Sequence, residues 1–141
     1  MSPMFPHLHV HTWFSFGCGA SSPDALAEAA AARGIPALAA TDTNTVAGAV
    51  EFQASCEAAG VRPILGAHLA AGGEDAVLLA EDERGWGTVC RAVSAVCWEA
   101  GGTGLTGWLS QDRSGMAVLI RDPALLERLV RLSGPDGLWA E

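Results

Sequence analysis

The chain has 141 residues, half of them hydrophobic, and a formal net charge of −8. This length suits one domain with a single buried core, and the composition excludes a disordered chain. The acidic balance argues against direct binding to a nucleic-acid backbone, which requires a positive surface. No stretch approaches the roughly 18 apolar residues of a membrane span.

The four cysteines, Cys18, Cys56, Cys90 and Cys97, show no CxxC pair and no regular spacing. Free thiols in a reducing compartment are a simpler interpretation of this pattern than a disulfide scaffold. The first six residues lack the basic and apolar stretches of a signal peptide. The sequence therefore predicts a cytoplasmic protein without a membrane anchor.

Three of the four histidines stand at alternate positions near the start of the chain: His7, His9 and His11. If residues 4–11 form a strand, residues two apart share a face, and the three imidazoles form a row. Neutral imidazole is a good ligand for zinc and related metals. The fourth histidine, His68, belongs to a second predicted strand. The pattern favours a metal site, and hydrogen-bonded histidines inside a pocket are the alternative.

The first half of the chain alternates between strands and helices. Ser22, followed by proline and aspartate, predicts the start of a helix that runs to residue 33. The apolar run 36–41 predicts a buried strand, residues 46–59 a helix, and residues 62–69 another strand. Such alternation with short connections is typical of parallel strands joined by right-handed crossovers. The sequence therefore predicts an α/β fold with a site at the carboxyl ends of its strands.

The second half continues with shorter elements. They are a turn at 72–75, a strand at 76–80, a helix at 86–100, a glycine break at 101–104, a weak helix around Trp108, a strand at 116–120, a helix at 123–132 and the start of a strand at 138. No repeat, low-complexity tract or linker interrupts the chain, so residues 1–141 are expected to form one domain. Asp42, just after the buried strand, could orient a ligand or cap the helix at 46–59; the cap is the simpler interpretation.

A series of motifs runs through the chain: HVHT (9–12), FSF (14–16) and GASSP (19–23), then ALAATD (37–42) with GAVEF (48–52), then RPILGA (62–67). In order and spacing this series resembles the polymerase and histidinol phosphatase (PHP) domain, in the version found at the amino terminus of bacterial DNA polymerase III alpha subunits. The resemblance implies a distorted seven-stranded β/α barrel with a metal cluster at the strand ends. This chain would form about half of that barrel.

The resemblance also implies a set of metal ligands, and three of them are changed here. Cys18 stands where the family has an acidic residue, Thr43 where it has a histidine, and His68 where it has a glutamate. His9, His11 and Asp42 are retained. One hypothesis is a tetrahedral zinc site made of His9, His11, His68 and Cys18, lined by His7, Asp42 and Thr43. The alternatives are a different ion such as manganese, or drift at a site that binds none.

Two classes of function remain open. Polymerase-linked PHP domains are often inactive, which implies a non-catalytic scaffold or interaction module of a DNA polymerase III alpha-type protein, in DNA replication or repair. Active members of the family are metal-dependent phosphoesterases, and some are 3′–5′ exonucleases, so an atypical histidine-rich enzyme is the alternative. A half barrel leaves strand edges unpaired. We therefore expect a protein partner or self-association to cover the open edge.

Overall fold

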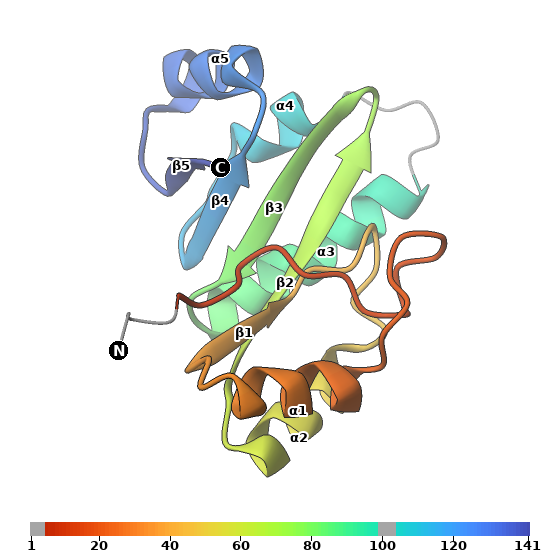
Figure 1. Cartoon of the computed structure of the whole chain (residues 1–141). Helices are drawn as coiled ribbons and strands as arrows, with labels where there is room; N and C mark the ends of the chain where they lie inside the picture. The colour runs from red at the N-terminus through yellow and green to blue at the C-terminus, as the bar shows by residue number, and fades with distance from the viewer. Residues whose placement is uncertain (1–4, 99–103) are drawn as a thin grey trace.

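The computed structural model describes residues 5–98 and 104–141. The elements, in chain order, are α1 (Pro23–Ala32), β1 (Ala37–Ala40), α2 (Ala49–Ala59), β2 (Arg62–Ala71), β3 (Glu74–Ala80), α3 (Glu83–Trp98), α4 (Gly104–Leu109), β4 (Met116–Ile120), α5 (Pro123–Ser133) and β5 (Leu138–Ala140) (Figure 1). Parts of two predictions, the end of the long helix and most of the glycine break, lie outside the described residues. Among the described residues, no helix is both long and apolar enough to span a membrane.

The strands form one five-stranded sheet in the order β1-β2-β3-β4-β5. β1 pairs with β2, and β4 with β5, in parallel, whereas β3 pairs antiparallel with both of its neighbours. The predicted α/β class is therefore confirmed, and β3 is the strand that runs against the other four. The reason is local: Gly72 and Gly73 both have positive φ, of 62° and 80°. Two such residues make a tight hairpin turn, which reverses the chain directly.

Two clusters of buried side chains fix the helices on the sheet. α1 and α2 pack on each other beside β1, around the fully buried Phe52 and Cys56. α3, α4 and α5 enclose a larger cluster on the other strands, with Leu78, Leu105 and Leu129 at its centre. The helices thus cover the sheet from two directions (Figure 1).

Side-chain caps set the starts of two helices as the sequence predicts. The Ser22 hydroxyl accepts a hydrogen bond from the Ala25 amide at 3.2 Å, and the Asp122 carboxylate accepts one from the Ala124 amide at 2.9 Å. α2 begins at Ala49, three residues later than predicted. The reason is that the preceding chain is still bound to the sheet, where the Asn44 amide donates to the His68 carbonyl at 2.8 Å.

The segment before α1 is extended, but the predicted strand at 4–11 is wrong. Met4 lies outside the described residues, and the segment makes a single bridge, between His7 and Leu38 of β1. The amides of Ala39 and Thr41 donate to carbonyls of this segment at 2.9 Å. The chain bends at His9, which interrupts regular pairing. The segment therefore lies along the outer side of β1 and crosses in front of the sheet (Figure 1).

Candidate metal centre

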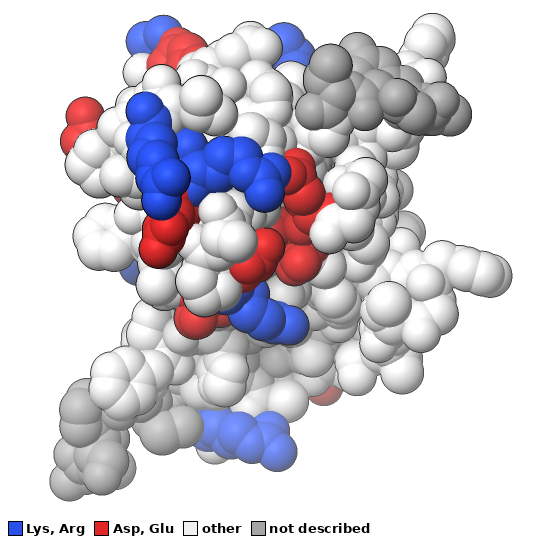
Figure 2. Space-filling view, turned by 90° about the horizontal axis from the view of Figure 1, so that it is seen from above, with Lys and Arg blue, Asp and Glu red and all other residues white. Residues whose placement is uncertain are grey.

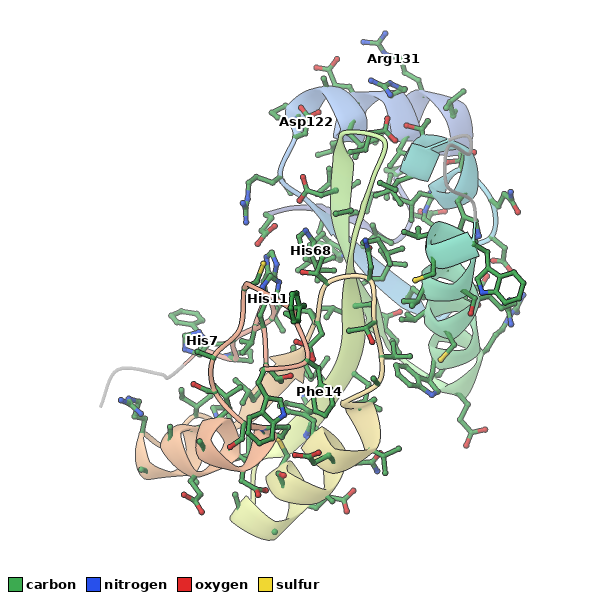
Figure 3. The ribbon with its side chains drawn as sticks, turned by 90° about the vertical axis from the view of Figure 1, so that its right-hand side faces the viewer. His7, His11, Phe14, His68, Asp122 and Arg131 are labelled. Atoms are coloured by element: carbon green, nitrogen blue, oxygen red, sulfur yellow. The ribbon has the colours of Figure 1, made fainter. Side chains whose placement is uncertain are left out.

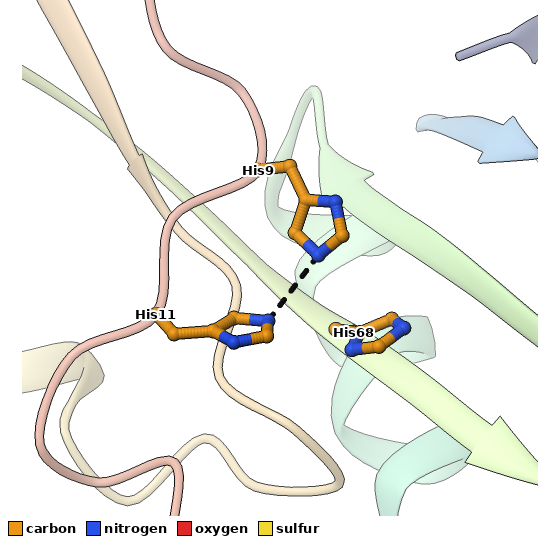
Figure 4. Close-up of side chains that lie close together, drawn as sticks. All are labelled: His9, His11 and His68. Carbon is orange, nitrogen blue, oxygen red and sulfur yellow. Dashed lines mark hydrogen bonds between the residues drawn. The ribbon is translucent and has the colours of Figure 1, made fainter. Parts of the chain in front are cut away.

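Three histidines from two distant segments converge at one place. His9 and His11 come from the extended segment, and His68 comes from β2 (Figure 4). Their ring centroids lie 4.9 to 5.3 Å apart. The Nε2 atoms of His9 and His11 are 3.2 Å apart. One ring nitrogen from each of the three residues lies within 4.8 Å of the others, and all three side chains are partly buried.

Two residues predicted for the site lie apart from this group. His7 is exposed and borders a small hollow with Val10 and Arg33, so the predicted row of three imidazoles on one face is wrong. The physical reason is the bend at His9, which ends the strict alternation of sides. Figure 3 shows His7 lying apart from His11 and His68. Cys18 is exposed in the loop after His11 and is not a member of the histidine group.

The buried carboxylate of Asp42 holds the loop that follows His11. Only 4% of Asp42 is exposed. The carboxylate accepts hydrogen bonds from the Thr12 amide at 2.7 Å, the Thr12 hydroxyl at 2.7 Å and the Ser15 hydroxyl at 2.6 Å. Asp42 therefore fixes the backbone next to His11. The prediction that Asp42 caps the following helix is wrong, because α2 starts at Ala49, seven residues after Asp42, and Gly48 occupies the cap position.

His68 is held at both ring nitrogens. The hydroxyl of Thr43 lies 3.3 Å from Nδ1, and an oxygen of Asp75 lies 3.2 Å from Nε2. Thr43 also forms a bridge to His68, so its backbone and side chain both reach this residue. Asp75 stands on β3 opposite Ala70, close to His68 across the hairpin. The sequence analysis missed Asp75 because the predicted turn at 72–75 includes it, whereas the structure confines the turn to Gly72 and Gly73 and places Asp75 on β3.

The third histidine, His9, contacts a carboxylate from the far end of the sequence. Its Nδ1 lies 2.6 Å from Glu141 Oε1. Glu141 directly follows β5, and Arg121 donates to the same oxygen at 3.3 Å. The contact links the segment beside β1, which crosses in front of the sheet, to the strand at the opposite edge of the sheet (Figure 1). The sequence analysis missed Glu141, which stood only as the last residue of the strand predicted from 138, with no sign that it would reach His9.

The surroundings of His11 favour its neutral imidazole. Burial lowers the pKa of His11 below its ordinary value, and the nearby His9 and His68 lower it further, against a smaller opposing effect of Asp42. Burial alone would raise the pKa of the Glu141 carboxyl. The hydrogen bond from His9 and the charges of His9 and Arg121 outweigh burial and lower this pKa. Neutral imidazole beside ionised carboxylate is the combination that binds a metal cation.

The donor set fits one tetrahedral metal ion. With zinc–nitrogen distances of 2.0–2.1 Å, two ligand nitrogens in a tetrahedral site lie about 3.3 Å apart. The observed separation of the His9 and His11 Nε2 atoms is 3.2 Å. His68 offers a nitrogen within 4.8 Å of the other two, and to bind the same ion it would exchange one of its contacts, with Thr43 at Nδ1 or with Asp75 at Nε2, for the metal. Three imidazole ligands would leave a fourth position open.

The fold and the site together define an α/β protein with a three-histidine cluster beside its sheet. The chain belongs to the PHP domain family, whose sequence profile matches residues 7–132. It is 49% identical over 92 residues to an error-prone DNA polymerase of Symbiobacterium thermophilum, covering 64% of this chain and 8% of the polymerase. It is 33% identical over 129 residues to the DNA polymerase III subunit alpha of Pseudomonas aeruginosa, covering 86% of this chain and 10% of that subunit.

The chain thus spans about a tenth of the length of the polymerases that it matches. A solved structure from Bifidobacterium adolescentis, whose assigned activity is that of a metal-dependent phosphoesterase, superposes with a TM-score of 0.50 at 21% sequence identity. The match covers 92% of this chain and 50% of that one. At this identity the likeness supports the fold alone. The predicted PHP family, and its similarity to DNA polymerase III alpha subunits, are confirmed, whereas the similarity to an error-prone DNA polymerase was not predicted.

Proposed function

We propose that this chain is a zinc-binding, non-catalytic PHP domain of a DNA polymerase III alpha-type protein, in which one ion holds together segments distant in sequence. The observation that carries the proposal is the use of the carboxylates around the histidines. Asp75 and Glu141 contact His68 and His9, and Asp42 binds the loop after His11. All three carboxylates thus support the histidines.

This arrangement supports one ion better than two. Phosphoesterases with two metals hold the ions about 3.5–4 Å apart with shared ligands, for which bridging carboxylates are well suited. Here the carboxylate of Asp42 already accepts three hydrogen bonds from protein groups. His68 stands where the resemblance places a glutamate and supplies a nitrogen in place of oxygen. Among the described residues the only group of three or more possible ligands is this histidine trio, which supports a single cation.

The same donor set favours zinc over manganese. Imidazole nitrogen suits zinc, copper, iron and nickel, whereas carboxylate and water oxygens suit magnesium, calcium and manganese. Three partly buried imidazoles offer three such nitrogens. The carboxylates of Glu141 and Asp75, which contact His9 and His68, would increase the basicity of these two ligands without binding the metal themselves.

The surface charge favours a protein partner over nucleic acid. The net charge is −8, and on the face shown in Figure 2 arginine and acidic side chains lie next to one another. Arg128 pairs with Glu74 at 2.6 Å, Arg121 with Glu141 at 3.3 Å and Arg131 with Glu127 at 2.9 Å. No broad basic surface forms on this face, whereas a phosphate backbone would require one. The outer edge of β5 is a place where such a partner could pair.

A second function, metal-dependent hydrolysis of phosphoesters, has one specific observation in its favour. Three histidine ligands with an open fourth position are the arrangement of many catalytic zinc sites, and a zinc ion there lowers the pKa of bound water. His9 and His68 are 19% and 16% exposed, so a small substrate could reach the cluster. This chain's own contribution would be to hold and orient the ion through His9, His11 and His68.

One pair of measurements tests the two functions. The purified protein is reconstituted with zinc, dialysed and analysed for metal, and hydrolysis of bis(p-nitrophenyl) phosphate is then followed. We expect one zinc per chain and hydrolysis no faster than that of the His9→Ala variant. Zinc-dependent turnover that is abolished by His9→Ala would reject the non-catalytic function and support the phosphoesterase function. A protein that retains no zinc would contradict both functions.

A further inference from the structure

We infer that Glu141 is a positioning residue, which selects the ring tautomer of His9 and aims its Nε2 atom into the histidine cluster. This inference rests on the proposed metal site and adds a residue that neither the sequence pattern nor the family resemblance assigned to it. Because Glu141 directly follows β5, the inference also connects this last strand to the metal site. The consequence is that metal affinity depends on a contact between opposite edges of the sheet.

The first step is the direction of the hydrogen bond between the two side chains. Nδ1 of His9 lies 2.6 Å from Glu141 Oε1, within the range of a strong charge-assisted bond. An ionised carboxylate can only accept, so the ring must donate from Nδ1. In a neutral imidazole the proton then occupies Nδ1, and Nε2 carries the lone pair. Nε2 is the atom that faces His11 at 3.2 Å.

The second step is that Glu141 itself is held firmly. Its amide donates to the Ile120 carbonyl at 3.0 Å, which continues the parallel pairing of β5 with β4. Arg121 donates to the same carboxylate oxygen at 3.3 Å. The side chain is 23% exposed. The carboxylate is therefore fixed by its own strand and by a neighbouring guanidinium before any metal arrives.

The third step is that His9 needs an external partner. It lies at the bend of a segment that forms a single bridge to the sheet, at His7. By contrast, Asp42 fixes the loop beside His11, and Thr43 and Asp75 hold His68. Without Glu141 the His9 ring would be free to rotate and to carry its proton on Nε2. That tautomer offers the metal no lone pair at the atom facing the cluster.

The expected effect follows from the general behaviour of such partners. Removing a carboxylate hydrogen-bonded to a metal-ligating histidine typically lowers metal affinity about 10–100-fold. We expect a loss in this range for Glu141→Ala and a smaller loss for Glu141→Gln, which keeps an acceptor oxygen but no charge. Glu127→Ala is the matched control, since this glutamate is exposed, pairs with an arginine and does not touch the cluster.

The experiment measures zinc affinity by competition with a chromophoric chelator, and the tautomer of His9 by long-range proton–nitrogen NMR of the metal-free protein. The expected spectrum has His9 protonated at Nδ1 in the wild type and in Glu127→Ala, and shifted toward protonation at Nε2 in Glu141→Ala. A purely structural role would lower the thermal stability of the metal-free protein without changing the tautomer. Unfolding curves of the metal-free variants therefore accompany the affinity measurement.

Two results would overturn the inference. The first is zinc affinity in Glu141→Ala within twofold of the Glu127→Ala control, and the second is His9 protonated at Nε2 in the wild type. Failure of the proposed metal site looks different, because His68→Ala would then leave zinc binding unchanged. If His68→Ala abolishes binding while Glu141→Ala does not weaken it, the site stands and the role of Glu141 is rejected.

Discussion

His9 and His11 lie two residues apart, yet different parts of the molecule hold them. Beside His11 the loop is anchored by the buried carboxylate of Asp42, about 30 residues away in the sequence. His9 is anchored by Glu141, which is 132 residues away and partly exposed. The first anchor is a dense buried network, and the second is a single contact between opposite edges of the sheet. We therefore expect the Asp42 side of the site to support folding and, on the proposed metal site, the Glu141 side to tune metal affinity.

The largest expected effect is on the Asp42 side. Replacing Asp42 with alanine leaves the Thr12 amide and the hydroxyls of Thr12 and Ser15 without their buried acceptor. Each unsatisfied buried group costs about 1–3 kcal/mol. We expect Asp42→Ala to lower the free energy of unfolding by about 3–5 kcal/mol in urea titrations. Glu127→Ala is the surface control. A change below about 1 kcal/mol would show that the network contributes little to folding.

The second prediction concerns the choice of metal. His68→Glu restores the oxygen donor that the resemblance implies at this position and removes one imidazole. We expect zinc affinity to fall and manganese affinity to rise, with the ratio of the two changing about tenfold or more, because oxygen donors suit manganese better. Competition titrations with both ions give this ratio. An unchanged ratio would indicate that His68 does not bind the ion.

The third prediction separates two histidines of the same segment. His9 belongs to the cluster, whereas His7 is exposed on another side. His9→Ala should lower zinc affinity at least about 10-fold, as loss of a ligand exceeds loss of its supporting partner. His7→Ala, the matched variant, should leave affinity unchanged. Equal losses in both variants would favour the row of three imidazoles that the alternating sequence predicts.

The fourth prediction is a pH dependence of the metal-free protein. Burial, followed by the effects of His9 and His68, lowers the pKa of His11 below its ordinary value of 6.5. The unfolded state therefore binds more protons than the folded state in the window below pH 6.5, and stability rises with pH there. Unfolding in the presence of a chelator should show full stability above this pH and a decline as the pH falls. His11→Gln should flatten the decline; a profile identical to that of the wild type would reject the shift.

The smallest expected effect belongs to Cys18. It is exposed and stands outside the histidine group. Cys18→Ser should change zinc affinity by less than about twofold, because no metal–sulfur bond is lost. A loss of about 10-fold or more in the same titration would restore the thiolate to the ligand set.

The elements that the sequence predicted well are those with strong local signals. The cap at Ser22, the proline after Asp122 and the fully apolar run of β1 each act within a few residues, and the structure confirms all three. The direction of β3 depended on two glycines at positive φ, a signal that was present but was interpreted as a longer turn. The apolar pattern of residues 46–59 favours Val50 as an inward position, but this residue lies in the first turn of α2 and is 83% exposed.

The site was predictable only in part, because its residues come from distant segments that meet only in the folded structure. Imidazoles at alternate positions identified His9 and His11, and the resemblance added His68. The bend at His9 removed His7 from the group, and no periodic pattern reports such a bend. Glu141 contacts His9 from 132 positions away in the sequence. Contacts of this kind depend on the tertiary structure and leave no local mark in the sequence.

The most direct test of the central claim is zinc K-edge X-ray absorption of the reconstituted protein, which counts the ligands around the ion. A single zinc held by His9, His11 and His68 predicts nitrogen or oxygen neighbours at about 2.0–2.1 Å, with the scattering pattern of imidazole rings. It predicts neither a sulfur neighbour at about 2.3 Å nor a second metal at about 3.5–4 Å. A sulfur shell would place a thiolate such as that of Cys18 on the ion. A second metal at about 3.5–4 Å would contradict the single-ion site and would support a two-metal phosphoesterase site.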